Sequence, residues 1–234
     1  MKLKSPVILA LDVDSKESCL ELVEQTKLSV GCFKLGPRLI VKYGAPLIRE
    51  IAEIAPVFVD NKYLDIPSTM VAAVRASFEA GASLVTVHAW AGNKALAELA
   101  KLEKDLSQER PFQILVVTVL TSFDQSDLPF GLSSSSIPEQ VEALAESAIS
   151  SGLTGLVCSP NEVKSLKNKY PKAFFVTPGI RVSNEVRDDQ QRTATPQEAL
   201  AWGASALVIG RPILMADDPG WAAQEILRRI QVNE

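Results

Sequence analysis

Eight short apolar runs, each followed by a segment with helical periodicity, constrain the fold of this 234-residue chain more than any other feature. The runs span residues 7–13, 32–36, 57–62, 84–89, 113–120, 155–159, 174–180 and 206–212. The helical segments span residues 17–30, 37–54, 69–80, 93–106, 138–151, 161–170, 196–202 and 219–230. Buried parallel strands read as continuous apolar runs, and eight strand–helix units of this size match one closed barrel. The sequence therefore predicts an α/β fold, a single-domain (β/α)8 (TIM) barrel over residues 1–234.

A doubly wound open sheet is the alternative fold for such an alternation. Against it, the first strand–helix turn, residues 12–16, lacks the Gly-x-Gly-x-x-Gly pattern that holds a dinucleotide, and the chain contains no P-loop pattern. Pro37, Pro138 and Pro196 stand where a helix tolerates proline in its first turn. The glycines expected to end helices are Gly31, Gly81, Gly152 and Gly203.

Composition excludes several classes of function. The 24 Lys and Arg are dispersed among 28 Asp and Glu, which gives a net charge of −4 and argues against a nucleic-acid partner. No apolar run reaches membrane-spanning length, and the N-terminal residues do not resemble a secretory signal. The three cysteines, Cys19, Cys32 and Cys158, lack the spacing of a disulfide framework or a zinc site. We therefore expect reduced thiols in a cytoplasmic protein that binds neither membrane nor metal, with Cys32 and Cys158 buried in their strands.

Polar residues gather at the expected strand ends, where barrels of this type place their active sites. Seven of the eight predicted strands end in such residues: Asp12, Lys34, Asp60, Lys62, His88, Thr118, Thr121, Ser122, Thr177, Arg181, Gly210 and Arg211. In the third strand, alternation puts Asp60 and Lys62 on the same face, and Asp65 follows in the turn. Taken alone, this Asp-x-Lys-x-x-Asp segment is either an active site or a structural ion network.

Two glycine- and arginine-containing segments follow the last two strands. They read Pro178-Gly179-Ile180-Arg181 and Ile209-Gly210-Arg211-Pro212, and the loops after strands seven and eight of a barrel frequently bind phosphate. The polar residues 181–195 would then form a lid over a phosphorylated substrate. The alternative is an ordinary surface loop whose arginines pair with acids.

The ordered motifs resemble the orotidine 5′-phosphate decarboxylase family. They are Leu9-Ala10-Leu11-Asp12, Phe33-Lys34-Leu35-Gly36, Asp60-x-Lys62-x-x-Asp65-Ile66-Pro67-x-Thr69, Val87-His88-Ala89, Val117 to Ser122, Thr177 to Arg181, Asp189-Gln190 and Ile209 to Pro212. The resemblance implies decarboxylation of orotidine 5′-phosphate to uridine 5′-phosphate and CO₂, the last step of de novo pyrimidine biosynthesis. It also implies a homodimer that needs no metal or other cofactor.

The resemblance assigns catalytic roles to the charged residues. Lys62 would be the proton donor, held in an array with Lys34, Asp60 and Asp65. Asp60 would lie near the departing carboxylate. Asp65 and Thr69 would reach into the active site of the neighbouring subunit.

The resemblance also assigns substrate contacts. Asp12 and Lys34 would bind the ribose hydroxyls, and Thr121 would contact the pyrimidine. The phosphate contacts that it implies are the side chains of Arg181, Gln190 and Arg211 and the amide of Gly210.

Two other functions remain open. A phosphosugar barrel of the 3-keto-L-gulonate 6-phosphate decarboxylase or hexulose phosphate synthase type shares Asp-x-Lys-x-x-Asp, but it uses a divalent metal and lacks the Ile66-Pro67-x-Thr69 continuation. A non-catalytic nucleotide-binding barrel would bind uridine monophosphate without turnover.

The single histidine and the three tryptophans are expected to have structural roles. His88 is interpreted as a hydrogen-bonded residue of the barrel mouth, because the proposed chemistry already has an acid. Trp90, Trp202 and Trp221 are expected to pack against the core.

Overall fold

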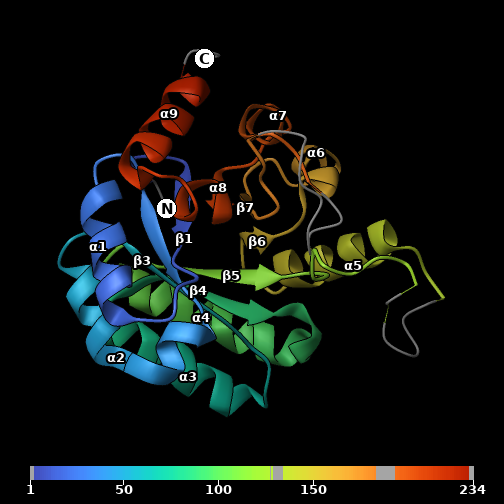
Figure 1. The fold of residues 1–234 in the computed structure, drawn as a ribbon. Helices are drawn as coiled ribbons and strands as arrows, with labels where there is room; N and C mark the ends of the chain where they lie inside the picture. Colours follow the sequence, from blue (N-terminus) through green and yellow to red (C-terminus); the bar gives the residue numbers. More distant parts are fainter. Residues whose placement is uncertain (1–2, 127, 129–133, 183–192, 232–234) are drawn as a thin grey trace.

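The chain closes into a barrel of eight parallel strands in sequential order, β1 to β8, in a computed structural model that describes residues 3–126, 128, 134–182 and 193–231 (Figure 1). The strands are β1 (Val7–Ala10), β2 (Cys32–Leu35), β3 (Val57–Tyr63), β4 (Ala82–His88), β5 (Gln113–Val117), β6 (Gly155–Val157), β7 (Phe174–Thr177) and β8 (Ala206–Ile209). Because β1 pairs with both β2 and β8, the sheet has no edge, so the barrel prediction is confirmed and the open sheet is excluded.

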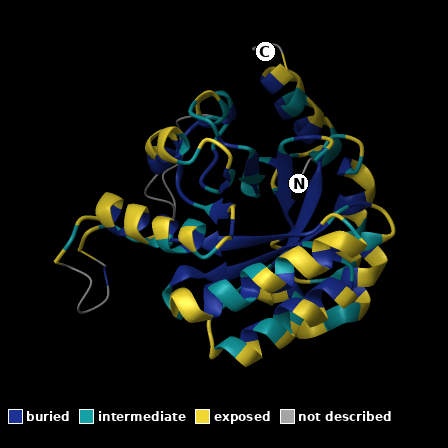
Figure 2. Cartoon of the chain, turned by 180° about the vertical axis from the view of Figure 1, so that it is seen from behind, coloured by how far each residue is buried: buried dark blue, intermediate teal, exposed yellow. Residues whose placement is uncertain are grey.

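Helices cover the outside of the barrel. They are α1 (Lys16–Thr26), α2 (Pro37–Ala52), α3 (Pro67–Glu79), α4 (Gly92–Glu109), α5 (Ile137–Ser150), α6 (Pro160–Lys169), α7 (Pro196–Ala201), α8 (Arg211–Leu214) and α9 (Pro219–Gln231), with a 3₁₀ turn, η1 (Ala89–Ala91), after β4. Figure 2 shows buried strands inside and helices whose outer faces are exposed. The described helices include none with the length and apolar character needed to cross a lipid bilayer.

The barrel interior changes from apolar to polar along the strands. One compact cluster fills it: Ile8, Cys32, Phe58, Leu84, Leu115, Val176 and Ala206. Because side chains alternate along a strand, the next inward positions are two residues further on, and on β2, β3 and β4 these are Lys34, Asp60 and Thr86. The apolar layer therefore supports a polar layer at the carboxyl ends of the strands.

The helix ends follow the sequence signals, with one exception. Pro37 and Pro196 begin α2 and α7, and Ser136 caps α5 in a capping box with Glu139. Gly81, Gly152 and Gly203 have positive φ angles of 112°, 100° and 107° after their helices, as predicted.

Gly31 does not end a helix as predicted, because α1 stops at Thr26. It is instead a point of close backbone approach. A Cβ atom built at Gly31 would lie 2.0 Å from the carbonyl oxygen of Ser5, and the Gly31 amide donates to the carbonyl of Val7 at 2.8 Å. Glycine is required here for space.

Several backbone features differ from the sequence prediction, and the strands β1, β5, β6 and β7 end two or three residues before the predicted ends. The helix α2 is interrupted at Gly44, which has φ 56° and ψ −151° just before Pro46. The eighth strand ends at Ile209 and not at Pro212, because Gly210 leaves the extended conformation and Arg211 begins α8. All three cysteines are buried, as expected for Cys32 and Cys158.

Candidate active site

Four charged side chains from three neighbouring strand ends form one cluster at the barrel mouth, which we call the charge cluster: Asp12, Lys34, Asp60 and Lys62. The Asp60 carboxylate lies 3.0 Å from Lys62 Nζ and 3.4 Å from Lys34 Nζ. Lys34 Nζ also lies 3.4 Å from Asp12 Oδ1. The side chains of Lys34 and Asp60 are 11% and 12% exposed, whereas those of Lys62 and Asp12 are 39% and 53% exposed, so the cluster opens towards solvent at Lys62 and Asp12.

The strand β3 is irregular at Asp60 and Lys62. Val59 is in register with Val85, but Tyr63 is in register with Val87, so β3 spends four residues where β4 spends two. Lys62 has φ 48°, the only positive φ among the described non-glycine residues. Regular alternation, on which the sequence prediction relied, is therefore wrong for this pair, although the predicted contact is present.

Thr86 holds this irregular segment, and the sequence prediction did not include it. Its hydroxyl donates to Asp60 Oδ1 at 2.9 Å and accepts from the amide of Lys62 at 2.9 Å. The available signal was the alternation of Leu84, Thr86 and His88 in β4, which puts a buried hydroxyl on the inward face.

The surroundings of Asp60 keep its carboxylate ionised. Burial acts to raise its pKa, but the charges of Lys34 and Lys62, with hydrogen bonds from Lys62 and Thr86, outweigh burial and lower the pKa. Two ammonium groups and two carboxylates make the cluster neutral overall. Such a cluster can hold an ammonium in place without a net charge at the barrel mouth.

Asp65 and Thr69 lie outside the charge cluster. Both are exposed, and within the described residues no ion pair joins Asp65 to Lys62. Asp65 Oδ1 accepts from the amide of Ile66 at 2.6 Å. Leu64 and Ile66, on either side of it, are large apolar residues that are 52% and 64% exposed.

His88 is buried beside the cluster. Its Nδ1 accepts from the amide of Trp90 at 3.3 Å, and the two rings stack with centroids 4.5 Å apart. Burial, followed by the charge of Lys62, lowers the pKa of His88 to about 4. The imidazole is therefore neutral near pH 7 and carries its proton on Nε2.

The tryptophan prediction holds for two of three residues. Trp202 packs against the core and Trp90 against His88. Trp221 is 63% exposed, so the packing prediction is wrong for it. It lies in the first turn of α9, whose buried face is made by Ala222, Ala223, Ile226 and Ile230.

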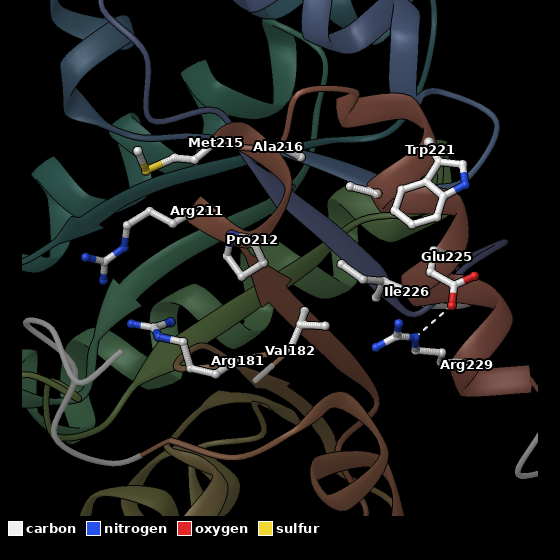
Figure 3. A pocket seen from close by; sticks show the side chains of 11 residues that line it. Arg181, Val182, Arg211, Pro212, Met215, Ala216, Trp221, Glu225, Ile226 and Arg229 are labelled. Carbon is white, nitrogen blue, oxygen red and sulfur yellow. Dashed lines mark hydrogen bonds and ion pairs between the residues drawn. The ribbon is translucent and has the colours of Figure 1, made fainter. Parts of the chain in front are cut away.

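The two predicted arginines come together at one cavity. Arg181 follows β7, Arg211 begins α8, and both line a cavity of about 460 Å³ next to α9 (Figure 3). The Gly210 position faces the charge cluster, because a Cβ atom built there would lie 3.9 Å from Asp12 Oδ2. The segment Gly210-Arg211 after β8 therefore lies next to the charge cluster, on the side of Asp12 after β1.

The other predicted residues vary in their position. Thr121 is half-buried in the turn after β5, and Gln190 lies outside the described residues. Thr118 is fully buried and donates to the carbonyl of Val157 at 3.0 Å, and Thr177 is also fully buried. These last two polar strand ends thus belong to the packed interior and not to the open site. Within the described residues, no group of three or more His, Cys, Asp or Glu side chains is arranged to hold a metal ion.

Comparisons with known proteins agree on one family. The family model described as "Orotidine 5′-phosphate decarboxylase / HUMPS family" matches residues 5–226. The chain is 41% identical over 225 residues to the orotidine 5′-phosphate decarboxylase of Dichelobacter nodosus, covering 95% of this chain and 97% of that one. It is 40% identical over 224 residues to that of Sphingopyxis alaskensis, with the same coverage. A crystal structure of orotidine 5′-phosphate decarboxylase from Lactobacillus acidophilus superposes with a TM-score of 0.85 at 32% identity, covering 97% of this chain and 99% of that one.

Proposed function

This chain belongs to the orotidine 5′-phosphate decarboxylase / HUMPS family, and we propose that it converts orotidine 5′-phosphate to uridine 5′-phosphate and CO₂ without a cofactor, with Lys62 as proton donor. Relatives that carry the decarboxylase name align over 97% of their own length. The observation that carries the proposal is the buried Asp60 carboxylate between two ammonium groups, at 3.0 Å and 3.4 Å, at the barrel mouth.

The reaction requires stabilisation of a localised carbanion. When the bond between C6 and its carboxylate breaks, the electron pair stays on C6 in an sp² orbital orthogonal to the ring π system, and CO₂ leaves. The Lys62 ammonium stabilises this charge and then transfers a proton from Nζ to C6. The short contact between Lys62 and Asp60 supports this role, because it fixes the ammonium before the substrate arrives.

Asp60 is proposed to lie beside the departing carboxylate. Its lowered pKa supports this role, since an ionised carboxylate at that place repels the substrate carboxylate, and this repulsion is relieved as neutral CO₂ leaves. Lys34 balances part of the charge of Asp60, and Thr86 orients the carboxylate through its hydrogen bond.

The remaining contacts divide between the sugar, the base and the phosphate. Asp12 and Lys34, which pair at 3.4 Å, are proposed to bind the ribose hydroxyls, and Thr121 the pyrimidine. The proposed phosphate contacts are Arg181, Gln190, Arg211 and the Gly210 amide. The cavity shared by the two arginines supports this set, and remote phosphate binding energy can be used to hold the reacting atoms in place.

We propose a homodimer in which Asp65 and Thr69 complete the site of the other subunit. Their exposure supports this, together with the exposed apolar side chains of Leu64 and Ile66, which a partner would cover. A cytoplasmic location is also proposed, and the burial of the three cysteines, whose spacing is not that of a disulfide framework, supports it.

One assay tests the reaction, the proton donor and the cofactor independence. Purified protein in excess chelator should remove the ultraviolet absorbance band of orotidine 5′-phosphate, and Lys62→Ala should lose nearly all turnover while still binding uridine monophosphate. The exposed α4 residue Lys101 offers a matched control, since Lys101→Ala removes an ammonium far from the mouth and should keep full activity. Activity that requires added divalent metal would reject the proposal in favour of the phosphosugar type, and full turnover by Lys62→Ala would reject the proton donor.

A further inference from the structure

The cavity behind the two arginines extends well beyond a phosphate site. It is lined by Arg181, Val182, Arg211, Pro212, Met215, Ala216, Trp221, Ala222, Glu225, Ile226 and Arg229. Figure 3 shows Arg181 and Arg211 at one end, Trp221 and Glu225 at the other, and Pro212 between them. Its volume of about 460 Å³ is that of a small-molecule site.

The walls of this cavity are apolar and only partly covered. Ile226 and Ala222 are buried beneath it, whereas Met215 and Trp221 at its rim are 79% and 63% exposed. Large apolar side chains that remain exposed around an apolar hollow are typical of a surface that a ligand covers. An indole and a thioether both contact flat aromatic rings favourably.

The charge of the lining residues favours an anion. Among the described residues, three arginines and one glutamate line the cavity, so this part of the lining carries a net positive charge. Hydrogen bonds from Arg228 and Arg229 lower the pKa of Glu225 to about 2, and each of these arginines donates through Nε at 2.8 Å. The charge of Glu225 is therefore already balanced by these two arginines.

We propose that this cavity binds a small organic anion with an aromatic body, with the rings against Trp221 and Met215 and the anionic group towards Arg181 and Arg211. This ligand is a different molecule from the nucleotide substrate, although the two would share the arginines. Because the same two arginines are proposed to bind the substrate phosphate, the ligand competes with phosphate, a consequence that rests on the proposed function.

The test uses 8-anilinonaphthalene-1-sulfonate, an aromatic anion whose fluorescence rises on binding, with the full chain. We expect one saturable site, and binding at least about tenfold weaker in Trp221→Ala and in Met215→Ala. Both side chains are mostly exposed, so either replacement should leave the fold and the turnover number unchanged. Leu28→Ala is the matched control, because Leu28 is 86% exposed and lies outside the cavity.

A second probe isolates the charge. N-phenyl-1-naphthylamine has the same rings without the sulfonate and should bind at least about tenfold more weakly. Equal binding of the two probes, or equal binding of the charged probe by Trp221→Ala, Met215→Ala and Leu28→Ala, would overturn the site. Inorganic phosphate should displace the charged probe, and failure to do so would overturn the competition. Because these readouts need no turnover, an inactive protein that binds the probe would reject the decarboxylase proposal and leave the site standing.

Discussion

Thr86→Val tests how the charge cluster is held. Valine has nearly the shape of threonine but lacks the hydroxyl, so the change removes the donor to Asp60 Oδ1 and the acceptor for the Lys62 amide, both at 2.9 Å. A hydrogen bond to a charged group contributes about 1.5–3 kcal/mol. If that stabilisation serves the transition state, kcat/KM should fall by about 10- to 150-fold, since about 1.4 kcal/mol corresponds to a factor of ten.

The same change should also shift the pH dependence. The hydrogen bond from Thr86 is one of the contributions that lower the pKa of Asp60, so its loss raises that pKa. Activity that needs ionised Asp60 is present above this pKa and is lost as the pH falls through it. The acid limb of kcat/KM should therefore move to higher pH in Thr86→Val.

The assay is the pH profile of orotidine 5′-phosphate decarboxylation, followed by ultraviolet absorbance, with Thr86→Ser as the control. Serine keeps the hydroxyl and loses only a methyl group, so it should retain most of the activity and the wild-type acid limb. Urea unfolding should show a loss of about 1–3 kcal/mol in Thr86→Val, because the Lys62 amide loses its partner. The reasoning is refuted if Thr86→Val and Thr86→Ser have the same kcat/KM and the same acid limb.

Three other predictions concern Arg211, the close backbone contact at Gly31 and the carboxyl group of Glu103. Arg211→Ala should lower kcat/KM for the nucleotide by at least about 100-fold and leave the poor turnover of the phosphate-free nucleoside unchanged; equal losses on both substrates would contradict a phosphate contact. Gly31→Ala should destabilise the fold by several kcal/mol (~3 or more) in urea unfolding, since its Cβ would lie 2.0 Å from the Ser5 carbonyl oxygen, and wild-type stability would show that the backbone there can move. Burial raises the pKa of Glu103 to about 7, so its contribution to stability is complete below the unfolded-state pKa near 4.5 and is lost as the pH rises through 7. Glu103→Gln should therefore gain stability over wild type progressively between these pH values, by up to about 3 kcal/mol, and a pH-independent difference in Tm would disprove the shift.

The barrel could be predicted because its signals are local and repeated. Each strand is an apolar run, and each helix has a proline, a capping residue or a glycine near its ends, as at Ser136 before α5 and Gly152 after it. Closure into a barrel was predicted from eight such units and from the absence of a Gly-x-Gly-x-x-Gly turn, since a doubly wound open sheet buries both faces as well. The arginine segments were predictable for the same reason, because Arg181 and Arg211 follow strands whose positions were already fixed.

Features that depend on contacts between distant segments could not be predicted. Gly31 looks like a helix cap in the sequence, but the carbonyl of Ser5, which is distant in the sequence and adjacent in space, is what excludes a side chain there. Trp221 is flanked by apolar residues in a helical pattern, yet its position on α9 faces away from the core. The helical pattern gives the spacing of the buried positions along a helix. It does not say whether a residue in the first turn lies on the buried or the exposed face.

The backbone at Lys62 is the clearest example of a feature that could not be predicted from the sequence, and it lies in the proposed active site. Regular alternation would already place Asp60 and Lys62 on one face, but two residues on the same face of a flat strand lie about 7 Å apart along it. The irregular register and the φ of 48° at Lys62 replace that regular geometry, and in this backbone the ammonium lies 3.0 Å from the carboxylate. A positive φ at a long, non-glycine side chain is costly, and it persists only where the surroundings hold it, here through the hydroxyl of Thr86 on the next strand. The strain therefore lies in the backbone of the residue that is proposed to donate the proton, and the group that maintains it is the one that Thr86→Val removes.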